Sequence, residues 1–582
     1  MAIGSGEVIE RLAAIGAAPG GLLALVVAPG VGAAMAGPSG VYSCPGGDQS
    51  IDEVRLVEAA LGPRWAMWSG DTATALTSAG LRVATSWDIA AVHRILFGGW
   101  TADPGRAWAR LHDLPSPAPE ATGALDLFSQ PEPDPADPDG PTQADGHLRA
   151  EWVAGGWAAT PERLARWATL AWEVAQLQAT ALGALPNPGR AASTARSESA
   201  AELLCAELSA DGLPLDRAIA EGIVASVVGP RPRNEAEAAA QRAARDAEVL
   251  RHAPPGGRFD LRSPGQVKSL LRFVGIEVPD TRAWRLEVLR DAHPLVDALL
   301  QWRKAERVAT TYGYAWLDEH VDDDGRLRGE WSGADGAAGR MTASAGLHNM
   351  PADMRPAVVA DPGHVFVRAD LGQIEPRVLA AVSGDEALAR ATLDPDLYQP
   401  VAEQLGVDRA TAKVAVLGAM YGQTTGHGAQ VLPRLRATYP VAMAYLEEGD
   451  RAGQVGDDLR TYGGRLVRMG VANAHDVTDR QARSQAAARG RYGRNALVQG
   501  AAAELFKVWA VTVRARAAAL DARIVLCLHD ELLVHVPAEH GAAAAALLER
   551  CLQEAAHRWA PDDSVHFVAD ISVIPRWSDA KD

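Results

Sequence analysis

The sequence predicts a multi-domain protein of mixed α/β class. Its 582 residues would form about four domains of roughly 150 residues, or two large domains with insertions. Apolar stretches alternate with turn residues through Leu96, and strand-like and helical segments alternate again from Gly339 onward. Residues 197–313, between these regions, are predominantly helical. We therefore expect two α/β regions with a helical region between them.

The composition predicts a soluble, cytoplasmic protein. The apolar share of 48% allows sizeable cores, and no stretch of about 18 residues is apolar throughout, which argues against a membrane span. The first residues lack the basic stretch of a secretory signal. The four cysteines lie far apart, which argues against a disulfide framework and a zinc ribbon. A net charge of −17 argues against coating nucleic acid by bulk charge, although a local basic groove stays possible.

The N-terminal region, residues 1–190, is expected to form one domain. Residues 22–27 are its first strong strand candidate, and a helix is expected over residues 161–182, opened by proline. Residues 115–146 are rich in Pro, Asp, Ala and Gly, and they bury too little apolar surface to order themselves. We expect a flexible acidic loop there. Residues 187–189, which read Asn-Pro-Gly, mark the expected boundary.

The next region is expected to be helical. Residues 200–213 and 234–252 have helical patterns, and the second segment is rich in Ala, Arg and Glu. Ser263 is expected to cap a further helix in which Pro264 is the first helical residue.

Two strand ends carry the first candidate catalytic residues. Residues 365–370 predict a strand that ends at Asp370, and two β-rich runs around His529-Asp530-Glu531 predict a hairpin with acids at its tip. Carboxylates that meet on one sheet supply the hard oxygen ligands that a pair of Mg²⁺ ions needs, with positions left for substrate phosphates. Alternatively, each aspartate is an ordinary turn or cap residue.

A helix that begins near Asp408 carries a third set of candidates. Arg409, Lys413, Leu417 and Tyr421 recur every four residues and therefore share one face. Such a face can bind a triphosphate at its basic end and stack a base at its aromatic end. Lysine is rare in this sequence, and Lys413 has apolar neighbours, where an unpaired charge would be costly. The alternative is a solvated basic face that ends in a core tyrosine.

A second stripe repeats this spacing. Arg491, Asn495 and Gln499 are again four residues apart, within a stretch that is locally basic in an otherwise acidic chain. That stretch contains Arg480, Arg483, Arg489, Arg491 and Arg494. A basic track of this kind suits a nucleic-acid backbone, and the alternative is a solvated arginine-rich helix face.

Together these segments resemble motifs of family A DNA polymerases, the bacterial polymerase I type. Residues 370–377 resemble the family's Asp-Tyr-Ser-Gln-Ile-Glu-Leu-Arg, residues 409–422 its Arg-x3-Lys-x3-Phe-x3-Tyr-Gly, and residues 529–531 its His-Asp-Glu. The remaining similar segments are residues 491–499, 339–351, 303–312 and 259–266. The resemblance covers about residues 197–582 and departs from the family at Leu371, Gly372 and Leu417.

The resemblance implies a role for each matching residue. Asp370 and Asp530 would hold two Mg²⁺ ions, Lys413 would act as general acid, and Glu375 would exclude a ribose 2′-hydroxyl. The other implied substrate contacts are Arg409, Tyr421, Gln373, Leu417, His529 and Arg491; the implied DNA contacts are Arg340, Asn495, Gln499, Arg307 and Tyr312; and Glu531 is auxiliary.

The resemblance also implies a fold and a function. A degenerate, RNase H-like 3′–5′ exonuclease domain (residues 1–190) would precede a right-hand polymerase domain (residues 191–582), with the thumb over 197–325 and the palm and fingers over 326–582. Because residues 22–27 and 167–171 contain no carboxylate, no proofreading is expected. We expect a monomer at the nucleoid that extends primer-template DNA with deoxynucleotides, in repair or replication. The alternatives are a single-subunit RNA polymerase and a catalytically weakened DNA-binding protein.

Overall fold

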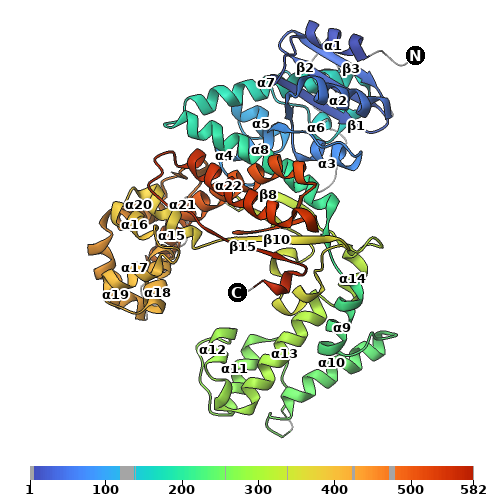
Figure 1. Cartoon of the computed structure of the whole chain (residues 1–582). Coiled ribbons are helices and arrows are strands. Elements are labelled where there is room, and N and C mark those ends of the chain that lie inside the picture. The colour runs from blue at the N-terminus through green and yellow to red at the C-terminus, as the bar shows by residue number, and fades with distance from the viewer. Residues whose placement is uncertain are drawn as a thin grey trace. The chain divides into compact units, whose positions relative to one another are not determined.

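The computed structural model describes residues 5–46, 48–117, 137, 139–255, 257–336, 338–422, 427–470 and 479–580 (Figure 1). It divides into two compact units. The first unit comprises Met1–Asp211, Glu330–Thr342 and Gly363–Val573, and the second comprises Gly212–Gly329, Ala343–Pro362 and Ile574–Asp582. Helices and sheets occur in the first unit in mixed order, which confirms the predicted α/β class.

A five-stranded sheet organises the N-terminal part of the first unit. Its strand order is β3-β2-β1-β4-β5, with β1 antiparallel to β2 and parallel to β4. The strands are β1 (Leu22–Ala28), β2 (Gly32–Gly37), β3 (Gly40–Pro45), β4 (Arg64–Met67) and β5 (Thr85–Asp88). The predicted strand at residues 22–27 is thus confirmed as β1.

Successive side chains of β1 point to opposite faces of this sheet, and helices pack on each face. Leu23, Leu25 and Val27 pack with α1 (Ser5–Ala14), α2 (Asp48–Leu61) and α3 (Gly70–Ser78). Ala24, Val26 and Ala28 pack with α4 (Ile89–Phe97), α5 (Pro104–Leu111), α6 (Ala150–Val153) and α7 (Pro161–Gly183). The helix expected over residues 161–182 is confirmed as α7. The expected acidic loop lies partly outside the described residues.

The described end of that acidic segment is tied to α7. Asp139 pairs with Arg163, and Asp137 accepts hydrogen bonds from Arg166 at 2.8 and 3.1 Å. The boundary expected at residues 187–189 coincides with the start of α8 (Pro188–Asp211), a helix that packs against β5 and against two strands further along the first unit, β8 (Trp331–Asp335) and β13 (Arg523–Leu528).

A four-stranded sheet of order β13-β14-β10-β15 forms the second centre of this unit. Its strands are β10 (His364–Leu371), β13 (Arg523–Leu528), β14 (Glu531–Pro537) and β15 (Ala569–Ile574). The predicted strand and the predicted hairpin are therefore confirmed. One face of this sheet packs on α15 (Ile374–Ser383), α21 (Asp479–Ala517) and α22 (Gly541–Trp559), where Val367, Ala369, Leu532 and Val534 are buried.

Helices α16 to α20 follow α15 in the chain. They are α16 (Glu386–Ala391), α17 (Tyr398–Leu405), α18 (Arg409–Met420), α19 (His427–Thr438) and α20 (Pro440–Val455). Short strands β8 (Trp331–Asp335), β9 (Arg340–Ala343), β11 (Leu459–Arg460) and β12 (Leu466–Val467) complete the pattern. Helix α21 extends into a segment, Asp479–Leu520, which is long and apolar enough by composition to cross a membrane. Its most apolar window is 89% buried within the protein, as in the core helix of a globular domain.

The second unit is mainly helical. Its helices are α9 (Arg217–Val228), α10 (Glu235–Leu250), α11 (Pro264–Phe273), α12 (Ala283–Glu287), α13 (Pro294–Thr311) and α14 (Tyr314–His320), and β6 (Leu213–Pro214) pairs with β7 (Arg326–Leu327). The helix predicted over residues 234–252 is confirmed as α10. Pro264 is the first residue of α11 and Ser263 stands at its N-cap position, as predicted, but the Ser263 side chain makes no capping hydrogen bond.

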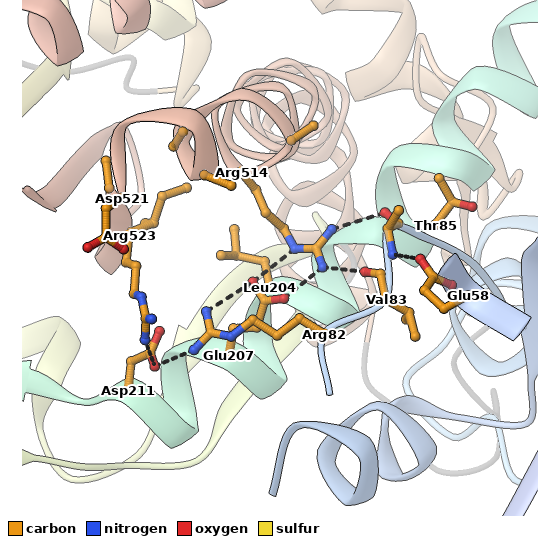
Figure 2. A pocket seen from close by; sticks show the side chains of 16 residues that line it. Glu58, Arg82, Val83, Thr85, Leu204, Glu207, Asp211, Arg514, Asp521 and Arg523 are labelled. Atoms are coloured by element: carbon orange, nitrogen blue, oxygen red, sulfur yellow. Dashed lines mark hydrogen bonds and ion pairs between the residues drawn. The ribbon is translucent and has the colours of Figure 1, made fainter. Parts of the chain in front are cut away.

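A cavity of about 460 Å³ lies where α8, α21 and the N-terminal part of the first unit meet (Figure 2). The Arg514 guanidinium on α21 donates to both Glu207 oxygens, at 2.7 and 2.9 Å, and to the carbonyl oxygens of Val83 and Ala84, at 2.7 and 3.1 Å. Arg82 and Arg523 pair with Asp211. These contacts tie the N-terminal part of the unit to the helices behind the four-stranded sheet.

Candidate active site

A pocket of about 310 Å³ gathers residues from six separate segments of the first unit. Its lining residues are Arg340, Gln373, Ile374, Glu375, Pro376, Tyr398, Leu417, Tyr421, Ala502, Ala503, His529 and Asp530. Seven of them are sequence-predicted site residues: Arg340, Gln373, Glu375, Leu417, Tyr421, His529 and Asp530. Strand ends, α15 and α18 thus place candidates that are far apart in the chain around one cavity.

The two strand-end aspartates lie at the same edge of the four-stranded sheet. Asp370 on β10 is the cross-strand partner of Glu531 on β14, and the Leu371 N–H donates to the Asp530 carbonyl oxygen at 2.8 Å. Burial, reinforced by the charges of Asp370 and Glu531, raises the pKa of Asp530 to about 7. The hairpin tip is strained, because His529 has a φ of +38°, which residues other than glycine rarely adopt.

The corner of the sheet formed by Asp370, Asp530 and Glu531 has ligand atoms that suit a divalent cation. Mg²⁺ prefers carboxylate oxygens, and a bound cation would offset the burial and the neighbouring negative charges that raise the Asp530 pKa. Within the described residues, no group of three or more His, Cys, Asp or Glu side chains is arranged to hold a metal ion by itself. Asp370 and Asp530 would therefore hold metal with substrate oxygens and water completing its coordination.

Glu375, on the first turn of α15, is fixed by two partners. Tyr421 donates its hydroxyl to Oε2 of Glu375 at 2.5 Å, and Arg340 donates to Oε1 at 2.8 Å. Only 13% of the Glu375 side chain is exposed. Burial, followed by this hydrogen bond, raises the pKa of Tyr421 to about 12, so its hydroxyl keeps its proton at neutral pH. The carboxylate therefore has one fixed orientation at the pocket wall.

Helix α18 presents the predicted stripe on one face, but the reasoning about Lys413 was wrong. Leu417 and Tyr421 line the pocket, whereas Lys413, one turn before Leu417, and Arg409, two turns before it, are exposed. The apolar neighbours of Lys413 at 412, 415 and 416 turn inward, whereas Lys413 and Val414 face solvent. Arg409 forms an ion pair with Asp396.

Gln373 lines the pocket and also forms hydrogen bonds with the neighbouring segment at Asp396 and Leu397. Its backbone is left-handed, with φ +52°, and it precedes α15. Its side chain donates to Asp396 at 3.2 Å and accepts from the Leu397 N–H at 2.9 Å. Beside it, the fully buried Arg377 donates to five backbone carbonyl oxygens, of Gly372, Thr392, Asp394, Pro395 and His566. Gln373 thus supports the segment that carries Tyr398 into the pocket.

The second stripe lies on α21 and only part of it is available to a ligand. Arg491 is exposed and packs against Gly422, where an added Cβ would lie 2.9 Å from Cγ of Arg491. Gln499 is partly buried on α21, one turn beyond Asn495. The Asn495 Oδ1 atom is buried and, among the described residues, has no hydrogen-bond partner.

The predicted basic track is split between two roles. Arg480 and Arg483 are exposed, as expected for a track that contacts a polyanion. Arg489 donates to the carbonyl oxygens of Gly453 and Gln454, and Arg494 donates to that of Ala419 at 2.9 Å. Arg489 and Arg494 therefore fasten α21 to α20 and α18, so these two arginines of the predicted basic track bind backbone carbonyl oxygens within the protein.

Arg307 and Tyr312 lie in the second unit, where they fix the loop at residues 346–349. Arg307 donates to the Asn349 carbonyl oxygen at 2.6 Å, and the Tyr312 hydroxyl donates to that of Gly346 at 2.9 Å. The Tyr312 ring is fully buried. Its role in this unit is to support the loop, which differs from the direct DNA contact that was predicted.

Two charged or aromatic residues of the site were missed from the sequence. Arg368 contacts Asp370 at 2.7 Å and Glu531 at 3.1 Å, and Tyr398 lines the pocket. Arg368 had a signal, because residues two apart on a strand share a face. Tyr398 had none, because tertiary packing of α17 brings it to the pocket.

One face of the N-terminal sheet is apolar over β1, the strand that contains no carboxylate. Ala24, Val26 and Ala28 of β1 pack in a cluster with Trp68 and Trp167, whose rings stack at 4.5 Å. The nearby buried carboxylate, Asp88, caps α4 by accepting from the Ala91 N–H at 2.7 Å.

Comparison with known proteins gives the family. The family model of DNA polymerase family A matches residues 232–579. DNA polymerase I of Deinococcus radiodurans is 26% identical over 376 residues, which cover 58% of this chain and 38% of that protein. The thermostable DNA polymerase I of Thermus thermophilus is 32% identical over 349 residues, which cover 53% of this chain and 40% of that protein. The chain thus spans about two fifths of the length of these relatives.

A solved structure supports the same fold. The polymerase domain of Pol1 from M. smegmatis, in complex with DNA primer-template and dNTP, has a TM-score of 0.69 at 21% sequence identity and covers 99% of each chain. Because the family model matches more than half of the 582 residues, the chain belongs to DNA polymerase family A.

Proposed function

We propose that this chain is a DNA-templated DNA polymerase that adds deoxynucleotides to a primer 3′ end with the help of Mg²⁺. One observation carries this proposal. Asp370 and Asp530 meet at one sheet edge, beside a 310 Å³ pocket walled by Glu375, Tyr421 and Leu417. The pocket offers carboxylates for metal, a fixed acid and an aromatic ring, which is the set of groups that nucleotidyl transfer uses.

The carboxylates of Asp370 and Asp530 would hold the metal ions and align the reacting groups. Mg²⁺ bound there would lower the pKa of the primer 3′-hydroxyl and offset the charge of the triphosphate. Asp530 must be ionised to bind metal, and its pKa near 7 makes this possible at neutral pH.

The exposed basic residues of α18 would bind the triphosphate. Arg409 would exchange its ion pair with Asp396 for phosphate oxygens, because a guanidinium fork matches phosphate geometry. Lys413, exposed one turn before Leu417, would donate a proton to the pyrophosphate leaving group. Tyr421 and Leu417 would pack against the nascent base pair from the pocket side.

Glu375 would select the sugar. A carboxylate held at both oxygens cannot swing aside for an additional hydroxyl, so a ribose 2′-hydroxyl would meet a fixed, buried charged group. This favours a DNA polymerase over a single-subunit RNA polymerase.

The N-terminal sheet would give no proofreading. A two-metal nuclease needs several carboxylates, and the stacked Trp68 and Trp167 lie over the apolar face of β1 instead. We assign this part of the chain a structural role in supporting α8 and α21.

The direct test is extension of a labelled primer on a DNA template with Mg²⁺, using deoxynucleotides and ribonucleotides separately. We expect extension with deoxynucleotides only, and relaxed selection in Glu375→Ala. DNA binding without extension by the wild type would instead favour the DNA-binding alternative, with Leu371, Gly372 and Leu417 as the departures to examine.

A further inference from the structure

The corner that would bind metal contains a positive charge of its own. Arg368 lies two residues before Asp370 on β10, so both side chains project from the same face of the sheet. Its side chain is only 8% exposed. A buried guanidinium persists only where carboxylates or other acceptors compensate its charge.

Three carboxylates from three adjacent strands surround this guanidinium. Asp370 Oδ2 lies 2.7 Å from Nη2 of Arg368, Glu531 Oε1 lies 3.1 Å from its Nε, and Asp570 Oδ2 lies 3.7 Å from its Nη1. Strand β10 stands between β14 and β15, which brings Glu531 and Asp570 to opposite sides of Arg368. Asp570 is largely exposed, with 72% of its side chain accessible, whereas Glu531 is buried.

We propose that Arg368 is a positioning residue with a fixed charge, which orients Asp370 and Glu531 and weakens the binding of free divalent cations at this corner. The inference rests on the proposed function, because it concerns the metal ions that Asp370 and Asp530 would hold. The guanidinium donates a hydrogen bond to Oδ2 of Asp370, and its positive charge repels a cation that approaches the same carboxylate. A residue with only a scaffolding role would leave cation affinity unchanged when it is replaced.

The test is Mn²⁺ binding to the full chain without DNA or nucleotide, measured as free Mn²⁺ by electron paramagnetic resonance. Arg368→Met is expected to bind Mn²⁺ about tenfold more tightly than the wild type, and Arg368→Lys, which keeps the charge, only about twofold differently. Asp530→Ala identifies the binding that belongs to this corner. Arg523→Met is the matched control, since it removes a positive charge at the far end of β13.

A second variant keeps the inference testable if Arg368→Met does not fold. Asp570→Ala removes an exposed carboxylate from Arg368, and we expect it to weaken Mn²⁺ binding while leaving the melting temperature nearly unchanged. Unchanged or weaker binding in folded Arg368→Met, or unchanged binding in Asp570→Ala, overturns the inference. If Asp530→Ala also leaves Mn²⁺ binding intact, the metal site of the proposed function fails with it.

Discussion

The orientation of Glu375 gives the sharpest prediction for sugar selection. Tyr421→Phe removes the hydroxyl that donates to Oε2 of Glu375 at 2.5 Å, but it keeps the aromatic ring that lines the pocket. Arg340 still holds the other oxygen at 2.8 Å, so the carboxylate is loosened and not lost. A hydrogen bond to a charged group contributes about 1.5–3 kcal/mol.

The lower figure applies because one of the two restraints remains. About 1.5 kcal/mol corresponds to roughly a tenfold change in an equilibrium or rate ratio. We expect the ratio of kcat/KM for a deoxynucleotide to that for the matching ribonucleotide to fall about tenfold in Tyr421→Phe, and further in Glu375→Ala. Single-nucleotide primer extension measures both values of kcat/KM.

A double variant tests whether Tyr421 affects sugar selection through its hydrogen bond to Glu375. If Tyr421 acts on selection through Glu375, then Tyr421→Phe added to Glu375→Ala changes the ratio no further. Tyr439→Phe, which removes a hydroxyl that donates to Gln404 at 3.0 Å, is the matched control and should not change the ratio. Additive effects of Tyr421→Phe and Glu375→Ala, or unchanged selection in Tyr421→Phe, would refute the reasoning.

Three further predictions concern stability, pH and proofreading. Arg514→Ala removes the close partner of the buried Glu207 and leaves it only Arg82, whose Nη1 lies 4.0 Å away, so the free energy of unfolding in urea should fall by about 3 kcal/mol. The exposed Arg516→Ala should cost at most about 1 kcal/mol, and equal costs would contradict the role of Arg514. Asp530 has a pKa raised from 3.8 to about 7, so the folded state holds its proton and stability falls as the pH rises through that window. Metal-free Asp530→Asn should therefore be about 2–4 kcal/mol more stable than the wild type at pH 8 and nearly equal at pH 4, and a difference independent of pH in thermal melts would exclude this linkage. With Mg²⁺, the protein should not shorten a mismatched primer; metal-dependent shortening that a change within residues 1–190 abolishes would disprove the lack of proofreading.

Much of the site could be predicted because it depends on local patterns. The sequence placed Asp370 at the end of one strand and Asp530 at the tip of a hairpin. Because β10 and β14 are antiparallel, the end of β10 lies beside the start of β14, which brings the two aspartates together. Four-residue spacing on α18 likewise put Leu417 and Tyr421 on one face.

The rest depends on tertiary packing that spacing does not encode. Apolar neighbours in sequence did not bury Lys413, because Ala412, Ala415 and Val416 point to the other side of α18 and Val414 is itself exposed. Arg494 looked free in the sequence, yet in the folded chain it donates to the carbonyl oxygen of Ala419. Arg368 is charged and central in a strand, and only the pairing of β10 with β14 and β15 brings its three carboxylates together.

The central claim is that Asp370 and Asp530 form one catalytic centre. The measurement that tests it most directly is single-turnover incorporation of one deoxynucleotide by the wild type, Asp370→Asn, Asp530→Asn and the double variant, with DNA affinity measured in parallel and Asp521→Asn as a control outside the pocket. We expect each single variant to lose about a thousandfold or more in rate at unchanged DNA affinity, and the double variant to lose little beyond that, because residues acting as a unit are not additive. Near-normal incorporation by either single variant would contradict the account.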